Sequence, residues 1–120
     1  MSPASNRPLT EPERELVRVM LERGSSEAKS FIPQLEFAEV TPWRCPCGCA
    51  SFNLQLQGHP PAPPGVHILG DFVFGEEREL SGIFVFSNAG RLSGVEVYGL
   101  AGDAPRVLPK PESLRPWGRE

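Results

Sequence analysis

The apolar residues in the first part of the chain recur at the spacing of an amphipathic helix. Between residues 16 and 21 they form one stripe, made of Leu16, Val17, Met20 and Leu21. Thr10 is followed three residues later by Glu13, which is the capping-box pattern of a helix start. Gly24 is suited to the backbone conformation that ends a helix. The pattern predicts a helix over residues 11–23.

A second apolar pattern of the same period follows directly. Its members lie at the i, i+3, i+4 and i+7 positions and are Ala28, Phe31, Ile32 and Leu35. Ser26 is the candidate N-cap. Pro33 lacks a backbone N–H and clashes with the preceding turn, so this helix is expected to kink near Pro33 or to end before it. Two helices joined at Gly24 and Ser25 would form an N-terminal helical hairpin.

Beyond residue 39 the pattern changes to the alternation of β-strands. Residues 52–57, FNLQLQ, alternate between apolar and polar side chains, which predicts a strand with one buried and one solvated face. Other apolar runs predict strands over residues 40–44, 68–74, 80–86 and 92–98. A turn at residues 88–90, where Gly90 supplies a positive φ, joins the last two strands. The proline-rich segment 58–66 is expected to be an extended loop.

Two helices followed by strands with short connections are the order of an α+β domain. The expected fold is an N-terminal helical hairpin packed on an antiparallel β-meander of four to five strands. The expected divisions are a disordered lead (1–9), a single domain (10–100) and a partly docked, proline-rich tail (101–120). Within the tail, residues 111–115 are expected to form one helical turn, with Leu114 and Trp117 docking onto the domain.

Composition and charge narrow the range of functions. About a quarter of the 120 residues are Leu, Ile, Val or Phe, enough for one folded core. The formal net charge is −3 and the basic residues are scattered, so nucleic acid is not an expected partner. No apolar stretch approaches the roughly 18 residues of a membrane span, and the N-terminus lacks the apolar core of a signal peptide. The expected location is therefore the cytoplasm, with no membrane partner.

The segment CPCGC at residues 45–49 suggests chemistry. Cys45, Cys47 and Cys49 could bind zinc or another soft metal through their thiolates, although the one-residue gaps differ from those of common zinc knuckles. Two other interpretations stay open: a turn with small buried thiols, and a redox site with a reversible Cys45–Cys49 disulfide or a reactive thiolate. An odd number of cysteines in one cluster fits a reducing compartment better than a secreted disulfide scaffold.

Neither histidine is expected to complete a metal site with these cysteines. A strand over residues 52–57 rises about 3.3 Å per residue, so it carries the chain roughly 20 Å away from Cys49. His59 follows the far end of that strand. If residues 68–74 return antiparallel beside it, His67 lies at the same far end.

The same geometry brings a different segment towards the cysteines. With antiparallel pairing, the residues returned beside Cys49 are those near 75–77. Glu76 or Glu77 is therefore the expected fourth ligand, with water or a group from another subunit as the alternatives. The predicted metal site consists of Cys45, Cys47, Cys49 and Glu76.

No constellation of catalytic residues is recognisable. The chain has no G-x-S-x-G, P-loop or G-x-G-x-x-G motif, so an enzyme is not the expected class. The leading hypothesis is a non-enzymatic protein-binding module of the accessory or immunity type. Trp43 and Trp117, each next to a proline, are the expected interface residues. The alternatives are a small metal-binding protein, with zinc as its cofactor, and a thiol-redox protein; otherwise no cofactor is expected.

Residues 88–100, NAGRLSGVEVYGL, and the proline-rich ending PKPESLRP resemble a family of short bacterial proteins of unknown function. That family also carries a cysteine-glycine run before its first alternating strand, as CPCGC does here. The resemblance covers most of residues 10–117 through motifs of low specificity, and it implies no activity and no catalytic residues. The CPCG opening is also similar to short metal-binding motifs of protein-export and nuclease-associated tails, whose trailing Cys/His pair is absent here.

Overall fold

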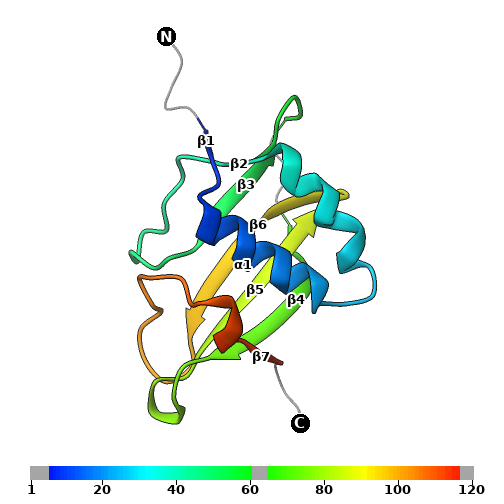
Figure 1. Ribbon diagram of the computed structural model, residues 1–120. Helices are drawn as coiled ribbons and strands as arrows, with labels where there is room; N and C mark the ends of the chain where they lie inside the picture. Colours follow the sequence, from blue (N-terminus) through cyan, green and yellow to red (C-terminus); the bar gives the residue numbers. More distant parts are fainter. Residues whose placement is uncertain (1–5, 61–64, 117–120) are drawn as a thin grey trace.

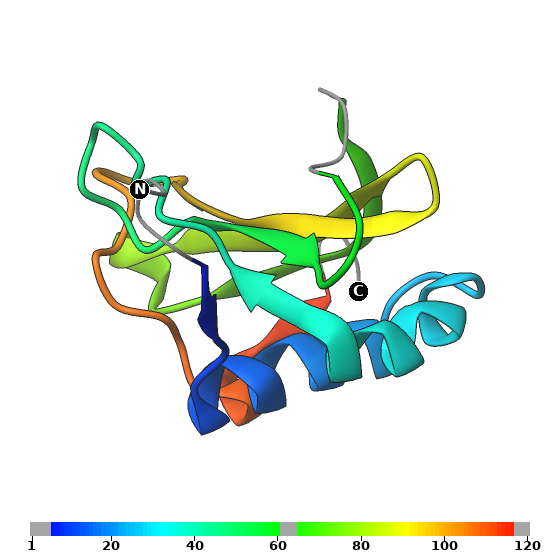
Figure 2. The same ribbon diagram turned by 90° about the horizontal axis from the view of Figure 1, so that it is seen from above.

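The structure of the protein, a computed structural model, describes residues 6–60 and 65–116. It has an α+β fold in which helices cover one face of an antiparallel sheet (Figure 1 and Figure 2). The described helices are α1 (Glu11–Glu22) and the 3-10 helices η1 (Ala28–Phe37), η2 (Glu77–Glu79) and η3 (Pro111–Ser113). The described strands are β1 (Arg7–Pro8), β2 (Ala38–Val40), β3 (Phe52–Leu56), β4 (His67–Phe74), β5 (Ser81–Asn88), β6 (Arg91–Gly99) and β7 (Arg115–Pro116).

The sheet has seven strands within the described ranges, where the sequence predicts four to five. The five predicted strands correspond to β2 to β6, although β2 ends at Val40 and does not span residues 40–44. The extra strands, β1 and β7, have two residues each, contain a proline and form the two edges of the sheet. Strands this short show no alternation in the sequence. Because β1 pairs with β2, the predicted disordered lead over residues 1–9 is wrong for residues 7 and 8.

The strand order is β1-β2-β3-β6-β5-β4-β7, which departs from the predicted meander at one place. Strands β4, β5 and β6 follow one another as antiparallel neighbours. Strand β3, however, pairs with β6, so that Phe52 lies opposite Val95 and Asn53 opposite Gly94. As a result, β6 and β5 separate β3 from β4.

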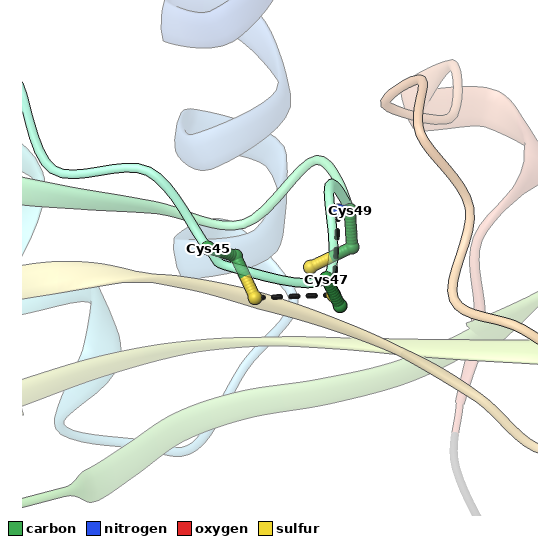
Figure 3. A group of neighbouring side chains, drawn as sticks. All are labelled: Cys45, Cys47 and Cys49. Atoms are coloured by element: carbon green, nitrogen blue, oxygen red, sulfur yellow. Dashed lines mark hydrogen bonds between the residues drawn. The ribbon is translucent and has the colours of Figure 1, made fainter.

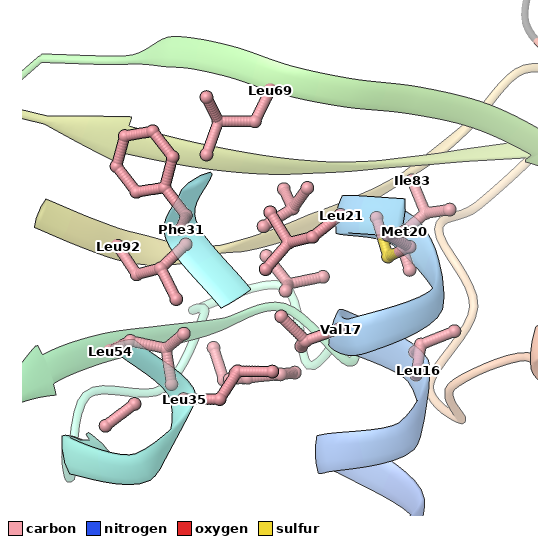
Figure 4. Close-up of a cluster of buried hydrophobic side chains, with 14 of the residues drawn as sticks. Leu16, Val17, Met20, Leu21, Phe31, Leu35, Leu54, Leu69, Ile83 and Leu92 are labelled. Atoms are coloured by element: carbon pink, nitrogen blue, oxygen red, sulfur yellow. The ribbon is translucent and has the colours of Figure 1, made fainter. Parts of the chain in front are cut away.

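Helix α1 confirms the first predicted helix and its cap. The Glu13 backbone N–H donates to Thr10 Oγ1 at 3.2 Å, and the Thr10 backbone N–H donates to Glu13 Oε1 at 2.9 Å. The apolar stripe of the helix packs against the sheet (Figure 4). Its members are at most 1% exposed: Leu16, Val17, Met20 and Leu21. The core therefore lies between α1 and the inner face of the sheet.

The second helix of the hairpin differs from the expectation. Segment η1 is a 3-10 helix of ten residues that continues through Pro33. The clash of an α-helical proline is with the carbonyl four residues earlier, and the tighter 3-10 winding avoids that geometry. The turn before η1 packs on β4, since the Ser25 backbone N–H donates to Leu69 O at 2.8 Å. Helix α1 and η1 lie on the same side of the sheet (Figure 2).

The opposite face of the sheet is covered by its own aromatic rings. Tyr98 lies over Gly82, where its ring occupies the space that a Cβ would need, and Phe86 lies over Gly94. The Phe84 ring centroid lies 5.8 Å from that of Phe86 and 6.0 Å from that of Tyr98. Aromatic rings that pack on glycines of a neighbouring strand stabilise a sheet. Strand β5 is paired on both edges, with β6 and with β4, so it lies in the interior of the sheet.

The C-terminal segment confirms the predicted helical turn. Segment η3 forms over Pro111–Ser113, and Leu114 is only 3% exposed in the core. Trp117, the other residue expected to dock, lies outside the described residues. Among the residues that are described, no helix is long and apolar enough to cross a bilayer.

Candidate metal centre

The cysteine cluster lies in the connection between β2 and β3, at one end of the sheet. The Gly48 backbone N–H donates to Cys45 O at 2.9 Å, which closes a β-turn. Pro46 and Gly48 occupy the second and fourth positions of this turn, where proline and glycine are favoured. Gly48 has a φ of +85°, in the region that L-residues avoid. The CPCG sequence therefore folds locally into a turn that carries Cys45 and Cys47.

The three sulfur atoms of this loop converge (Figure 3). Cys45 Sγ and Cys47 Sγ lie 3.1 Å apart, and all three Sγ atoms lie within 4.8 Å of one another. The Cys49 backbone N–H donates to Cys47 Sγ at 3.4 Å, which holds that sulfur over the turn. All three cysteines are free; Cys47 is exposed, and the other two are partly exposed. The thiols are therefore accessible and do not act as buried hydrophobic groups.

Ser51 connects the cluster to the sheet. Its Oγ accepts a hydrogen bond from the Val97 backbone N–H at 2.8 Å and lies 3.3 Å from Val97 O, to which it donates. Cys49 Sγ donates to the same Ser51 Oγ at 3.2 Å. Ser51 is 8% exposed, so these bonds are largely shielded from water. When Cys49 ionises, the hydroxyl proton of Ser51 can turn from the Val97 carbonyl to the thiolate.

The surroundings separate the pKa values of two of the thiols. Partial burial acts to raise the pKa of Cys49, but hydrogen bonds from the Ser51 hydroxyl and backbone N–H outweigh it and lower this pKa from 9.0 to about 7. The hydrogen bond with the Cys47 thiol raises the pKa of Cys45 from 9.0 to about 11. Of these two thiols, Cys49 therefore ionises first.

Cys45 and Cys49 line a cleft of about 750 Å³, and Cys47 is exposed beside it. The β2–β3 connection forms one wall, and Arg106 and Leu108 of the C-terminal segment contribute to another. Arg7 and Glu13 also line the cleft and pair with each other at 2.8 Å. Since this pair is neutral overall, the guanidinium groups of Arg44 and Arg106 make the described lining positive.

Two contacts join the C-terminal segment to the cysteine loop. The Ala50 backbone N–H donates to Pro105 O at 2.9 Å. The Arg106 guanidinium lies against Gly48, where a Cβ would come within 2.5 Å of Nη1. A positive charge therefore lies beside the turn that carries the thiols.

The position of Glu76 corrects the predicted fourth ligand. That prediction required residues 52–57 and 68–74 to be neighbouring strands, whereas β6 and β5 lie between β3 and β4. Strand β4 does end at the same end of the sheet as Cys49, as expected, but three inter-strand spacings put it roughly 14 Å to the side. Among the described residues, no carboxylate or histidine joins the three sulfurs, so Glu76 is not part of the group.

The two histidines lie at the opposite end of the sheet, as the sequence predicts. His59 follows β3, and its carbonyl accepts a hydrogen bond from Gln55 Nε2 at 2.9 Å. His67 begins β4, with its Nε2 3.0 Å from a Glu27 carboxylate oxygen. The direction of the strands alone therefore predicts at which end of the sheet the two histidines lie, even though the predicted strand order is wrong.

Trp43, one of the two expected interface residues, lines the cleft and is 43% exposed. Its indole ring is accessible to a partner at the rim of the cysteine cluster. A role in an interface stays a prediction for Trp43. Trp117, the second expected interface residue, falls outside the described residues.

Comparisons with known proteins do not identify the chain. A scan against protein-family models, a search of curated proteins and a search of solved structures each find no match. Function is therefore inferred from the residues and the geometry of the cleft.

Sequence reasoning missed two residues of this site. Ser51 lies two positions after Cys49, and a polar residue so close to a thiol is a signal that could have been used. No nearby sequence feature indicates Arg106, because its position depends on the β3–β6 pairing and on the path of the C-terminal segment back over the loop.

Proposed function

We propose that the protein binds a thiophilic metal ion, with zinc among the candidates, through Cys45, Cys47 and Cys49. The observation that carries this proposal is the convergence of the three Sγ atoms within 4.8 Å of one another. Sulfurs bound at about 2.3 Å to one metal lie about 3.8 Å apart in tetrahedral and about 4.0 Å apart in trigonal geometry. The Cys45–Cys47 distance of 3.1 Å and the limit of 4.8 Å bracket those values. Movements of less than about 1 Å would close the site around an ion.

The loop supports this function through its protonation chemistry. Metal ligation needs thiolates, and the ion displaces the protons that the thiols carry. The lowered pKa of Cys49, about 7, supplies one thiolate near neutral pH. The raised pKa of Cys45, about 11, means that the metal must displace its proton, so affinity should increase with pH.

A competition titration tests the proposal. Reduced protein is titrated with Zn(II) against a chromophoric chelator, and separately with Cu(I), while the reactivity of the thiols is followed. We expect one ion per chain and protection of all three thiols. Cys47→Ser should weaken binding by at least about 100-fold, because it removes one ligand of three. Trp43→Phe, in the same cleft, should leave it unchanged. Thiols that stay fully reactive with both ions in excess would refute the proposal.

Protein binding, the function that the sequence led us to expect, is a second candidate. The exposure of Trp43, 43%, at the rim of the cleft favours it, because partly exposed tryptophans are enriched in interfaces. The protein would be used to capture partners from its host, in parallel with a Trp43→Ala variant. A partner lost from the variant supports this candidate, and equal capture by both chains counts against it.

A thiol-redox function is the third candidate. It is favoured by the lowered pKa of Cys49, since the thiolate is the reactive form of cysteine. Peroxide would oxidise two thiols to a disulfide and be reduced to water. Disulfide mapping after stoichiometric peroxide treatment tests this, and three intact thiols would argue against it.

A further inference from the structure

The cysteine site offers three sulfur ligands and no fourth ligand from the described residues. Ser51 Oγ lies 3.2 Å from Cys49 Sγ, but it is occupied by hydrogen bonds with the Val97 N–H and carbonyl. Zn(II) in structural protein sites is almost always four-coordinate. Cu(I), a soft monovalent ion, accepts coordination by three thiolates alone, which is the number and kind of ligands found here.

The charge around the loop also favours a monovalent ion. Three thiolates with a monovalent ion form a complex with two negative charges, whereas a divalent ion leaves one. Arg44 and Arg106 line the same cleft, and the guanidinium of Arg106 lies against Gly48 in the cysteine turn. Nearby cations stabilise the complex of the monovalent ion more than that of the divalent ion, because the attraction is proportional to the charge of the complex.

We infer that the site takes a monovalent thiophilic ion, Cu(I), in three-sulfur coordination, and that Arg44 and Arg106 favour this ion over Zn(II). This inference rests on the proposed metal-binding function. The protons that the thiols still carry, three when Cys49 is protonated and two when it is a thiolate, are released to solvent as three metal–sulfur bonds form, and no electron is transferred because the copper is supplied as Cu(I). Cys47 is exposed and the cleft is open, so the ion can enter without opening of the fold.

Coordination number is the first readout. Reduced protein is loaded anaerobically with one equivalent of Cu(I) from a bidentate chelator, or with one equivalent of Zn(II), and X-ray absorption is measured at each metal edge. We expect one Cu(I) per chain with three sulfur neighbours and no oxygen or nitrogen neighbour. Zn(II) should instead show an additional oxygen or nitrogen from water or buffer. A fourth ligand on Cu(I), or several copper ions bridged between two chains, would overturn the inference.

The arginine variants supply the second readout, the ratio of Cu(I) to Zn(II) affinity. Arg106→Gln and Arg44→Gln should each lower this ratio by about two- to threefold, as expected for one unit charge at roughly 8–10 Å in a water-like medium. A substitution that only distorts the loop should weaken the binding of both ions and leave the ratio of their affinities unchanged. Arg106→Lys keeps the positive charge and should retain the wild-type affinity ratio. Arg78→Gln removes one positive charge from η2, beyond β4, and should leave the ratio unaltered.

The two possible failures are distinguishable. If neither ion protects the thiols, the metal-binding function itself is refuted. If Zn(II) binds with three sulfurs while Cu(I) gains a fourth ligand, or if the arginine variants leave the ratio unchanged, metal binding stands and the preference for a three-coordinate monovalent ion is wrong.

Discussion

Replacement of Ser51 by alanine should change the acidity of Cys49 directly. The hydroxyl of Ser51 lies 3.2 Å from Cys49 Sγ and contributes to the lowering of the Cys49 pKa to about 7. A hydrogen bond to a charged group contributes about 1.5–3 kcal/mol, and one pKa unit corresponds to about 1.4 kcal/mol. In Ser51→Ala the pKa of Cys49 should therefore rise to about 8–9. The thiolate fraction at pH 7 would fall from about one half to about one tenth or less.

The assay is the rate of alkylation of Cys49 against pH in metal-free protein, with the modified cysteine identified by tandem mass spectrometry. Ser93→Ala is the matched control, because Ser93 is also a buried serine, in strand β6, and its Oγ donates to Arg91 O at 3.0 Å. We expect the Cys49 profile of this control to be unchanged. A midpoint that stays near pH 7 in Ser51→Ala, or that moves equally in both variants, would refute the role assigned to the Ser51 hydroxyl.

Four further predictions concern stability, the cysteine loop and the pH dependence of folding. Leu16→Ala should lower the free energy of unfolding by about 3–5 kcal/mol in urea titrations, because Leu16 is 1% exposed, and a loss below about 1 kcal/mol would contradict this core position. Gly48→Ala should weaken metal binding with little change in global stability, because its φ of +85° disfavours an L-residue and the Arg106 guanidinium would have to move to admit a Cβ; unchanged binding would argue against the turn. Thr10→Ala should destabilise by about 1 kcal/mol. Burial acts to raise the pKa of Glu13, but hydrogen bonds from Arg7 and the cap lower it overall, so stability should be lost as pH falls through that lowered pKa and be pH-independent above its ordinary value.

Local patterns predicted the parts of the fold that depend on local physics. The capping box and apolar stripe of α1 both form as expected, because each involves residues within one or two helical turns. The alternation over β3 matches its burial pattern residue by residue. The hairpin turn between β5 and β6 has positive φ at Ala89 and Gly90, and glycine at the second position is its signature in the sequence.

The features that the sequence did not reveal depend on contacts between distant segments. Pairing of β3 with β6 brings together residues about forty positions apart, and no alternation pattern encodes a strand's neighbour. Strands β1 and β7 consist of two residues each, too few to show a period. The 3-10 winding of η1 arises because Pro33 conflicts with α-helical geometry while Phe31 and Leu35 still pack into the core.

The same distinction between local and long-range contacts applies to the cysteine site. The convergence of Cys45 and Cys47 follows from the local CPCG turn and could be anticipated from proline and glycine positions. The assignment of Glu76 failed because it required a strand order that the sequence does not specify. The contact of Arg106 with the cysteine loop could not be predicted for the same reason, because Arg106 is distant from the loop in the sequence.

The metal content of the purified protein tests metal binding most directly. The chain would be purified from its host without chelators and under reducing conditions, and metal per chain would be measured together with titration of the thiols. We expect close to one thiophilic ion per chain, with Cys45, Cys47 and Cys49 unreactive until a chelator removes it. Less than about 0.1 ion per chain, with all three thiols freely titrating and no uptake on reconstitution, would contradict it.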